Sequence, residues 1–86
     1  MLSDEVIKSK LITFISKSYL DGGEQITETT ALTDLNILDS SSIFDVVDYV
    51  MREFNTKMPL EEIHAENFKD VDSLCETIVK LQGVEA

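Results

Sequence analysis

A serine directly behind an aspartate, in the run Leu38-Asp39-Ser40, is the feature of this sequence best placed to do chemistry. A long polar stretch ends there and an apolar stripe with helical spacing begins, so Ser40 is expected at the first residue of a helix. The first turn of a helix has unpaired backbone N–H groups and the positive end of the helix dipole, and both favour an anion. The position therefore suits a serine that carries a phosphate-linked group.

The residues around Ser40 do not supply the base that a serine nucleophile needs. Asp39 beside it is anionic, and the local segment has no histidine or lysine that could deprotonate the hydroxyl. Ser40 is therefore predicted to accept a group that another enzyme transfers, and the chain is not expected to be an enzyme. The plainer alternative is that Ser40 only caps the helix, since serine is strongly favoured at an N-cap.

Apolar residues at helical spacing predict an all-α fold, with Ser40 at the start of one of its helices. The expected architecture is a small bundle of three main helices plus a short third helix around residues 61–66, behind Pro59. The main helices are expected from residue 3 to about 20, from about 40 to 54, and from about 70. Their apolar stripes are Ile7, Leu11, Phe14 and Ile15; Ile43, Val47, Val50 and Phe54; and Val71, Leu74, Ile78 and Leu81.

The ends of these helices are marked by capping residues. Ser3 and Asp70 are expected N-caps, because their side chains can accept a backbone N–H. The run Asp21-Gly22-Gly23 is expected to end the first helix, and Gly83 to lie just past the last. In the long connection over residues 21–38, Asn36 tolerates a left-handed backbone. The apolar residues expected to anchor this connection are Ile26, Leu32, Leu35 and Ile37.

The length and composition limit the possible functions. With 86 residues, the chain is expected to form one domain over residues 1–86, structured from about residue 3 to 82. Such a domain buries only about 60 to 65 per cent of its unfolded surface, too little for a large enclosed catalytic pocket. One cysteine, Cys75, and one histidine, His64, argue against a disulfide or a zinc site. A cytoplasmic protein without a signal peptide or membrane span is expected.

A net charge of −10 argues against nucleic acid or an anionic membrane as a partner, because both need clustered Lys or Arg. A basic protein surface is the expected complement, although the acids could also serve only to keep the surface solvated. The charge is concentrated between Lys17 and Arg52, where no Lys or Arg occurs. The acids of this segment are Asp21, Glu24, Glu28, Asp34, Asp39, Asp45 and Asp48.

Several short segments share one resemblance. They are ITETTAL at residues 26–32, Ile37-Leu38-Asp39-Ser40, Glu53-Phe54, Met58-Pro59 and Glu66-Asn67-Phe68 ahead of Val71. In this order they resemble the acyl carrier protein family, whose members have a helix, a long loop, Asp-Ser at the start of an acidic second helix, a short third helix and a fourth helix. The resemblance covers nearly the whole chain.

The resemblance implies that Ser40 carries 4′-phosphopantetheine, transferred from coenzyme A by a phosphopantetheinyl transferase. In the family, the modified serine directly follows Asp and lies fourteen positions before the Phe that closes the second helix. Ser40 meets both conditions with Asp39 and Phe54, whereas Ser41 and Ser42 do not.

The implied role is that of a freestanding, monomeric acyl or aminoacyl carrier. The thiol of the attached group would hold the cargo as a thioester. A ligase or acyltransferase would load the cargo, and a downstream synthase or transferase would use it. Fatty cargo would need a slot between helices, but the residues that could line one are first of all expected core. They are Val47, Val50, Phe54, Ile63, Phe68 and Leu74.

The resemblance also implies a partner surface on the second helix. Asp45 and Asp48, aided by Asp39 and Glu53, would attract basic enzyme surfaces through weak, salt-sensitive contacts. The alternative for each acid is plain solubility.

Apolar contact could come from Phe44 and Met51, for which core packing is the alternative. Ser41 stands where the family usually has a leucine that touches partners and the prosthetic arm. The loss of that leucine removes roughly 1.5 to 3 kcal/mol of possible apolar burial and favours a specialised pathway.

Two other kinds of protein could have such an acidic segment. A calcium loop beginning at Asp34 fails, because Asp39 falls where a glycine is needed and Asp45 where a bidentate glutamate is needed. A non-enzymatic acidic helical adaptor, binding a basic partner through the second helix, stays open.

Overall fold

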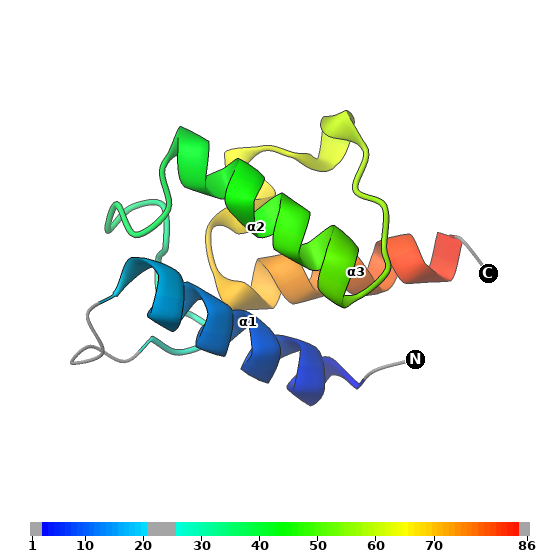
Figure 1. Ribbon diagram of the computed structural model, residues 1–86, viewed down its shortest axis with the longest axis horizontal. Helices are drawn as coiled ribbons and strands as arrows, with labels where there is room; N and C mark the ends of the chain where they lie inside the picture. The colour runs from blue at the N-terminus through cyan, green and yellow to red at the C-terminus, as the bar shows by residue number, and fades with distance from the viewer. Residues whose placement is uncertain (1–2, 21–25, 85–86) are drawn as a thin grey trace.

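The computed structural model describes residues 3–20 and 26–84. Within these ranges it contains α1 (Asp4–Tyr19), α2 (Ser40–Glu53), η1 (Leu60–Glu62), η2 (Ala65–Phe68) and α3 (Val71–Val84), and no strand. The predicted all-α fold is confirmed. The short third helix, however, is two separate 3-10 turns, because Ile63 and His64 between them have non-helical backbone angles. Figure 1 shows α1 and α2 with opposite chain directions, and the start of α1 and the end of α3 at the same end of the bundle.

The first helix begins and packs as its sequence predicts. The Ser3 hydroxyl accepts the Val6 N–H at 3.4 Å, and Ile7, Leu11 and Ile15 are fully buried. The predicted stop at Asp21-Gly22-Gly23 lies outside the described residues.

The buried face of α2 differs by one position from the predicted stripe. Val46, Val47 and Val50 are buried, whereas Ile43 is only half-buried. Val46 was missed because a stripe drawn through Ile43, Val47 and Phe54 is one residue wide, and the true contact face spans two adjacent rows.

The last helix confirms its N-cap but not its predicted end. The Asp70 carboxylate accepts the Ser73 N–H at 2.8 Å, and the stripe from Val71 to Leu81 is buried. The helix continues through Gly83 to Val84, so the prediction that Gly83 lies past the end is wrong. A helical glycine costs only about 1 kcal/mol relative to alanine, which does not force a helix to stop.

The long loop is anchored at Leu32, which is fully buried. The Leu32 N–H donates to the Lys69 carbonyl at 2.7 Å, and the Leu32 carbonyl accepts the Ile37 and Leu38 N–H groups at 2.9 and 3.0 Å. Asn36 has a φ of 59°, as its residue type predicts. Leu35 is 63% exposed, so its predicted role as an anchor is wrong: the chain reverses at Asn36, and Leu38 is buried instead.

Aromatic side chains join α1 to α2. The Phe14 ring stacks on Tyr49 with centroids 4.0 Å apart, and Tyr49 meets Phe54 edge-on at 6.0 Å. The Tyr49 hydroxyl donates to the Lys10 carbonyl at 3.3 Å. Stacked and edge-on ring pairs are favourable geometries, so this contact fixes the orientation of α2 against α1.

Candidate functional site

The candidate site is the start of α2, where the long loop ends and the helix begins. Asp39, with extended backbone angles, is the N-cap, and one oxygen of its carboxylate accepts the Ser41 and Ser42 N–H groups at 3.0 and 2.8 Å. Ser40 is the first helical residue and is exposed. The alternative that Ser40 is itself the cap is therefore wrong, because Asp39 makes the capping contacts.

Two of the backbone N–H groups at this helix end, those of Ser41 and Ser42, are already hydrogen-bonded, whereas the sequence predicted unpaired groups. Asp39 accepts two of them through its side chain and the Ile43 N–H through its carbonyl, at 3.0 Å. Within the described ranges, the Ser40 hydroxyl makes no hydrogen bond. The site therefore fits a phosphate-linked group that extends from the surface into solvent, rather than one enclosed by helix N–H donors.

Asp39 is stabilised as the anion by these contacts. Hydrogen bonds from Ser42, and then from Ser41, lower the pKa of the Asp39 carboxyl, since they favour its charged form. An ionised carboxylate next to Ser40 supplies no positive charge to an anionic group at this position.

The cap makes a prediction about acid stability. Because the pKa of Asp39 is lower in the folded than in the unfolded protein, its stabilising effect is present above the unfolded value near 4 and is lost as the pH falls through the folded value. Asp39→Asn keeps a good N-cap that does not titrate in this range. We expect urea midpoints between pH 5 and pH 2.5 to fall less steeply in Asp39→Asn than in the wild type, and equal slopes would contradict this.

The outer face of α2 carries the apolar residues that the sequence left undecided. Phe44 is 56% exposed and Met51 is 39% exposed, so both lie on the surface rather than in the core. Ser41 and Asp48 are exposed too. Asp48 pairs with Arg52 at 2.9 Å, one helical turn further on.

The other two acids of α2 contact α1. Glu53 forms an ion pair with Lys10 at 2.9 Å. Asp45 lies 3.4 Å from the Tyr19 hydroxyl, which is also 3.4 Å from the Ser42 carbonyl. Each acid of α2 thus has a different neighbour, which sequence spacing alone does not reveal, because Lys10 and Tyr19 are distant along the chain.

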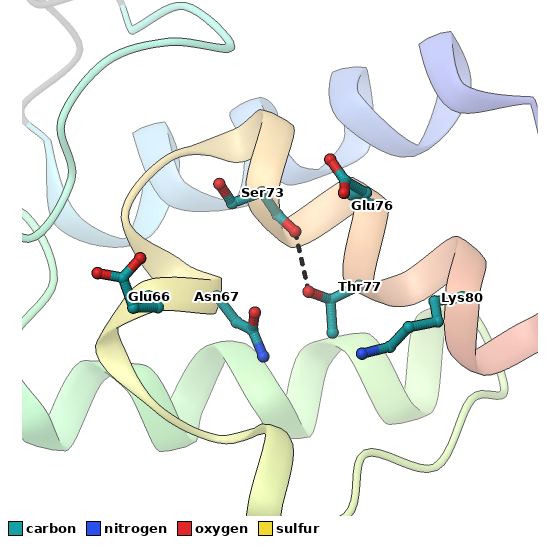
Figure 2. A pocket seen from close by; sticks show the side chains of 6 residues that line it. All are labelled: Glu66, Asn67, Ser73, Glu76, Thr77 and Lys80. Atoms are coloured by element: carbon teal, nitrogen blue, oxygen red, sulfur yellow. Dashed lines mark hydrogen bonds between the residues drawn. The ribbon is translucent and has the colours of Figure 1, made fainter.

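The residues predicted to line a cargo slot pack in the core. Val50, Phe68 and Leu74 are fully buried, Val47 and Phe54 are nearly so, and Ile63 packs against them half-buried. Figure 2 shows a different, polar hollow between η2 and α3, in which Thr77 donates to the Ser73 carbonyl at 2.9 Å. Its lining residues are Glu66, Asn67, Ser73, Glu76, Thr77 and Lys80. The burial of the six apolar residues supports their interpretation as core residues.

Of the two other candidate groups, Cys75 packs in the core and His64 lies on the surface. Cys75 is 2% exposed, its thiol donates to the Asp4 carbonyl at 3.7 Å, and burial raises the thiol pKa. His64 is exposed and lies 3.3 Å from the Asn67 amide.

In residues 3–20 and 26–84, no group of three or more His, Cys, Asp or Glu side chains is placed to hold a metal ion. None of the helices in these ranges has the length and apolar character needed to cross a membrane.

Comparison with known proteins agrees with this arrangement. No protein-family model matches the chain. A curated relative, "Probable acyl carrier protein PigG" from Serratia sp. (strain ATCC 39006), is 37% identical over 79 residues, which cover 91% of this chain and 91% of the relative. Identity at this level over nearly the full length of both proteins, together with the helical bundle and the Asp-Ser start of α2, shows that the chain belongs to the acyl carrier protein family.

Proposed function

We propose that Ser40 is the attachment site of 4′-phosphopantetheine and that the protein carries acyl or aminoacyl groups in a specialised biosynthetic pathway. The observation that carries this proposal is the exposed Ser40 at the first position of α2, directly behind an N-cap that is not Ser40 itself. Its hydroxyl is thus not needed to hold the helix. When attached, the group supplies a terminal thiol that holds cargo as a thioester.

In the proposed modification, Ser40 is the acceptor and not the catalyst. Its hydroxyl oxygen forms the new bond to phosphorus, the hydroxyl proton goes to a base of the phosphopantetheinyl transferase, and adenosine 3′,5′-bisphosphate leaves from coenzyme A. The base belongs to the transferase in this proposal, because the Asp39 carboxylate accepts the Ser41 and Ser42 N–H groups and its lowered pKa makes it a weak base. The carrier is therefore a substrate of each enzyme and not an enzyme itself.

The exposed side of α2 is the surface we propose for partner enzymes. Phe44 and Met51 offer apolar contact there. Ser41, next to the attachment point, stands where the family usually has a leucine. Partners would be the transferase, a cargo-loading ligase or acyltransferase, and a downstream synthase or transferase. The buried state of the apolar residues between the helices favours cargo that stays outside the bundle, such as a small or polar acyl group.

The proposal is tested by incubating the folded protein with coenzyme A, Mg²⁺ and a broad-specificity phosphopantetheinyl transferase, followed by intact-mass measurement. We expect a gain equal to one phosphopantetheinyl group. An unchanged mass, with a known carrier modified in the same tube, would instead support the acidic-adaptor alternative.

A further inference from the structure

The chain that follows α2 leaves the helix at the end opposite the attachment serine (Figure 1). Asn55 has a φ of 50°, a left-handed angle that ends the helical path and turns the chain. From there to Pro59, side chains alternate between core and solvent. Phe54, Thr56 and Met58 are buried, whereas Asn55 and Lys57 are exposed. Asn55 and Lys57 are thus presented to solvent between three buried neighbours.

Hydrogen bonds of the buried Thr56 hold this segment in place. Its hydroxyl donates to the Phe54 carbonyl at 3.0 Å and accepts the side-chain amide of Gln82, on the last turns of α3, at 3.3 Å. A buried hydroxyl that both donates and accepts in this way is satisfied within the protein. The backbone between Asn55 and Lys57 is therefore tied to α3.

This end of α2 carries an open hollow of about 600 Å³, lined by Met51, Asn55, Thr56 and Lys57. Met51 is one helical turn before Asn55 and is partly exposed, so it supplies an apolar wall. Lys57 supplies a cation, and the Thr56 hydroxyl is already used within the protein. The hollow therefore fits an apolar group together with an anionic one.

The charge of Lys57 is not offset by an acid. Five of the seven Lys and Arg side chains form ion pairs in the part of the chain that the structure describes, and Lys57 is not among them. Glu53, the acid nearest before Lys57 in the sequence, pairs with Lys10 on α1 at 2.9 Å. Asp48 pairs with Arg52 at the same distance. In a chain with a net charge of −10, this hollow is thus opposite in charge to the acidic start of α2.

We propose that the hollow receives an acidic side chain of a partner enzyme, which pairs with Lys57 while a neighbouring apolar side chain packs on Met51. The inference rests on the proposed function, since it concerns enzymes that bind the carrier. Eleven residues separate Ser40 from Met51, roughly 16 Å along the helix axis, so this contact is separate from any contact at Ser40. Opposite charges at the two ends of α2 require opposite charges on the partner, which determines the direction in which the carrier docks.

The test is an NMR titration of the full-length, ¹⁵N-labelled protein with the capped tripeptide Glu-Leu-Glu. We expect the backbone amide signals of Asn55, Thr56 and Lys57 to shift progressively, and to shift less at high salt. The capped tripeptide Gln-Leu-Gln, which has the same shape without the charge, should not shift them. Lys57→Gln is expected to weaken binding of Glu-Leu-Glu by roughly two- to fivefold, the size typical of one exposed ion pair.

Lys17→Gln is the matched control, because Lys17 is the other cation without an ion pair in the described ranges and is exposed on the last turn of α1. It should leave binding unchanged. The inference would be overturned by no shift at the highest soluble concentration of Glu-Leu-Glu, by equal shifts with Gln-Leu-Gln, or by equal losses in the two lysine variants. Inorganic phosphate that shifts these amides as strongly as Glu-Leu-Glu would also overturn it, because the hollow would then not select a carboxylate partner.

The same titration is expected to be unchanged in Ser40→Ala, because the hollow does not include the attachment serine. A failure of the proposed function is read from the intact mass of the wild-type protein after treatment with the transferase. The two failures are therefore distinguishable.

Discussion

Replacing Ser40 by alanine is expected to abolish the mass gain with coenzyme A and transferase completely, because alanine has no oxygen to bond to phosphorus. Ser41→Ala and Ser42→Ala should still be modified. Exposure alone does not separate Ser40 from Ser41, since both lie on the surface. The spacing in the family distinguishes the two serines, because the modified serine there directly follows an aspartate, as Ser40 follows Asp39. Intact-mass measurement of the three variants under identical conditions distinguishes the serines.

The loss in Ser40→Ala must come from chemistry and not from unfolding. Asp39, not Ser40, accepts the hydrogen bonds that cap α2, and alanine is the best helix former, so the variant should keep its helical content and urea midpoint. Modification of Ser40→Ala to the wild-type extent would show that another residue carries the group.

Phe68→Ala is expected to lower the free energy of unfolding strongly. Phe68 is fully buried at the end of η2, where the short turn brings it into the core. Truncating a buried phenylalanine costs about 3 to 5 kcal/mol, whereas a domain of this length is stable by only about 4 to 13 kcal/mol. We expect the urea midpoint, followed by far-ultraviolet circular dichroism, to fall steeply or the variant to be partly unfolded without urea.

Phe44→Ala is the matched control, because it deletes the same atoms from a side chain that is 56% exposed. Its free energy of unfolding should change by less than about 1 kcal/mol. Equal losses in the two variants would mean that Phe68 is not the core residue described above, or that Phe44 packs in solution.

Local patterns predicted most of the fold because they act within one or two turns of chain. Ser3 and Asp70 cap their helices through oxygens that reach the N–H three residues on, and Asn36 takes the left-handed backbone that its side chain tolerates. The prediction that the helix ends before Gly83 was wrong, because a glycine in a helix costs less than the packing of the last turns of α3 contributes. Leu35 misled because hydrophobicity does not tell which side of a reversal faces solvent.

The sequence predicts which residues form the candidate site, but not the interactions that these residues make. The run Asp39-Ser40 was found from sequence, yet its charge state and hydrogen bonds depend on which residue becomes the N-cap. Contacts of the α2 acids with Lys10 and Tyr19 join residues that are 26 or more positions apart, so no helical spacing could predict them. Tyr19 can be read from the sequence as a tyrosine at the end of the first helix. Its contact with Asp45 depends on how the two helices pack.

The central claim, that Ser40 carries 4′-phosphopantetheine, is tested most directly by locating the added group in the wild-type protein. The modified chain would be digested and the peptide containing residues 40–42 fragmented in a mass spectrometer. We predict that the added mass lies on Ser40 alone. A fragment series that places it on Ser41 or Ser42, or an unmodified peptide from protein exposed to an active transferase, would contradict the account.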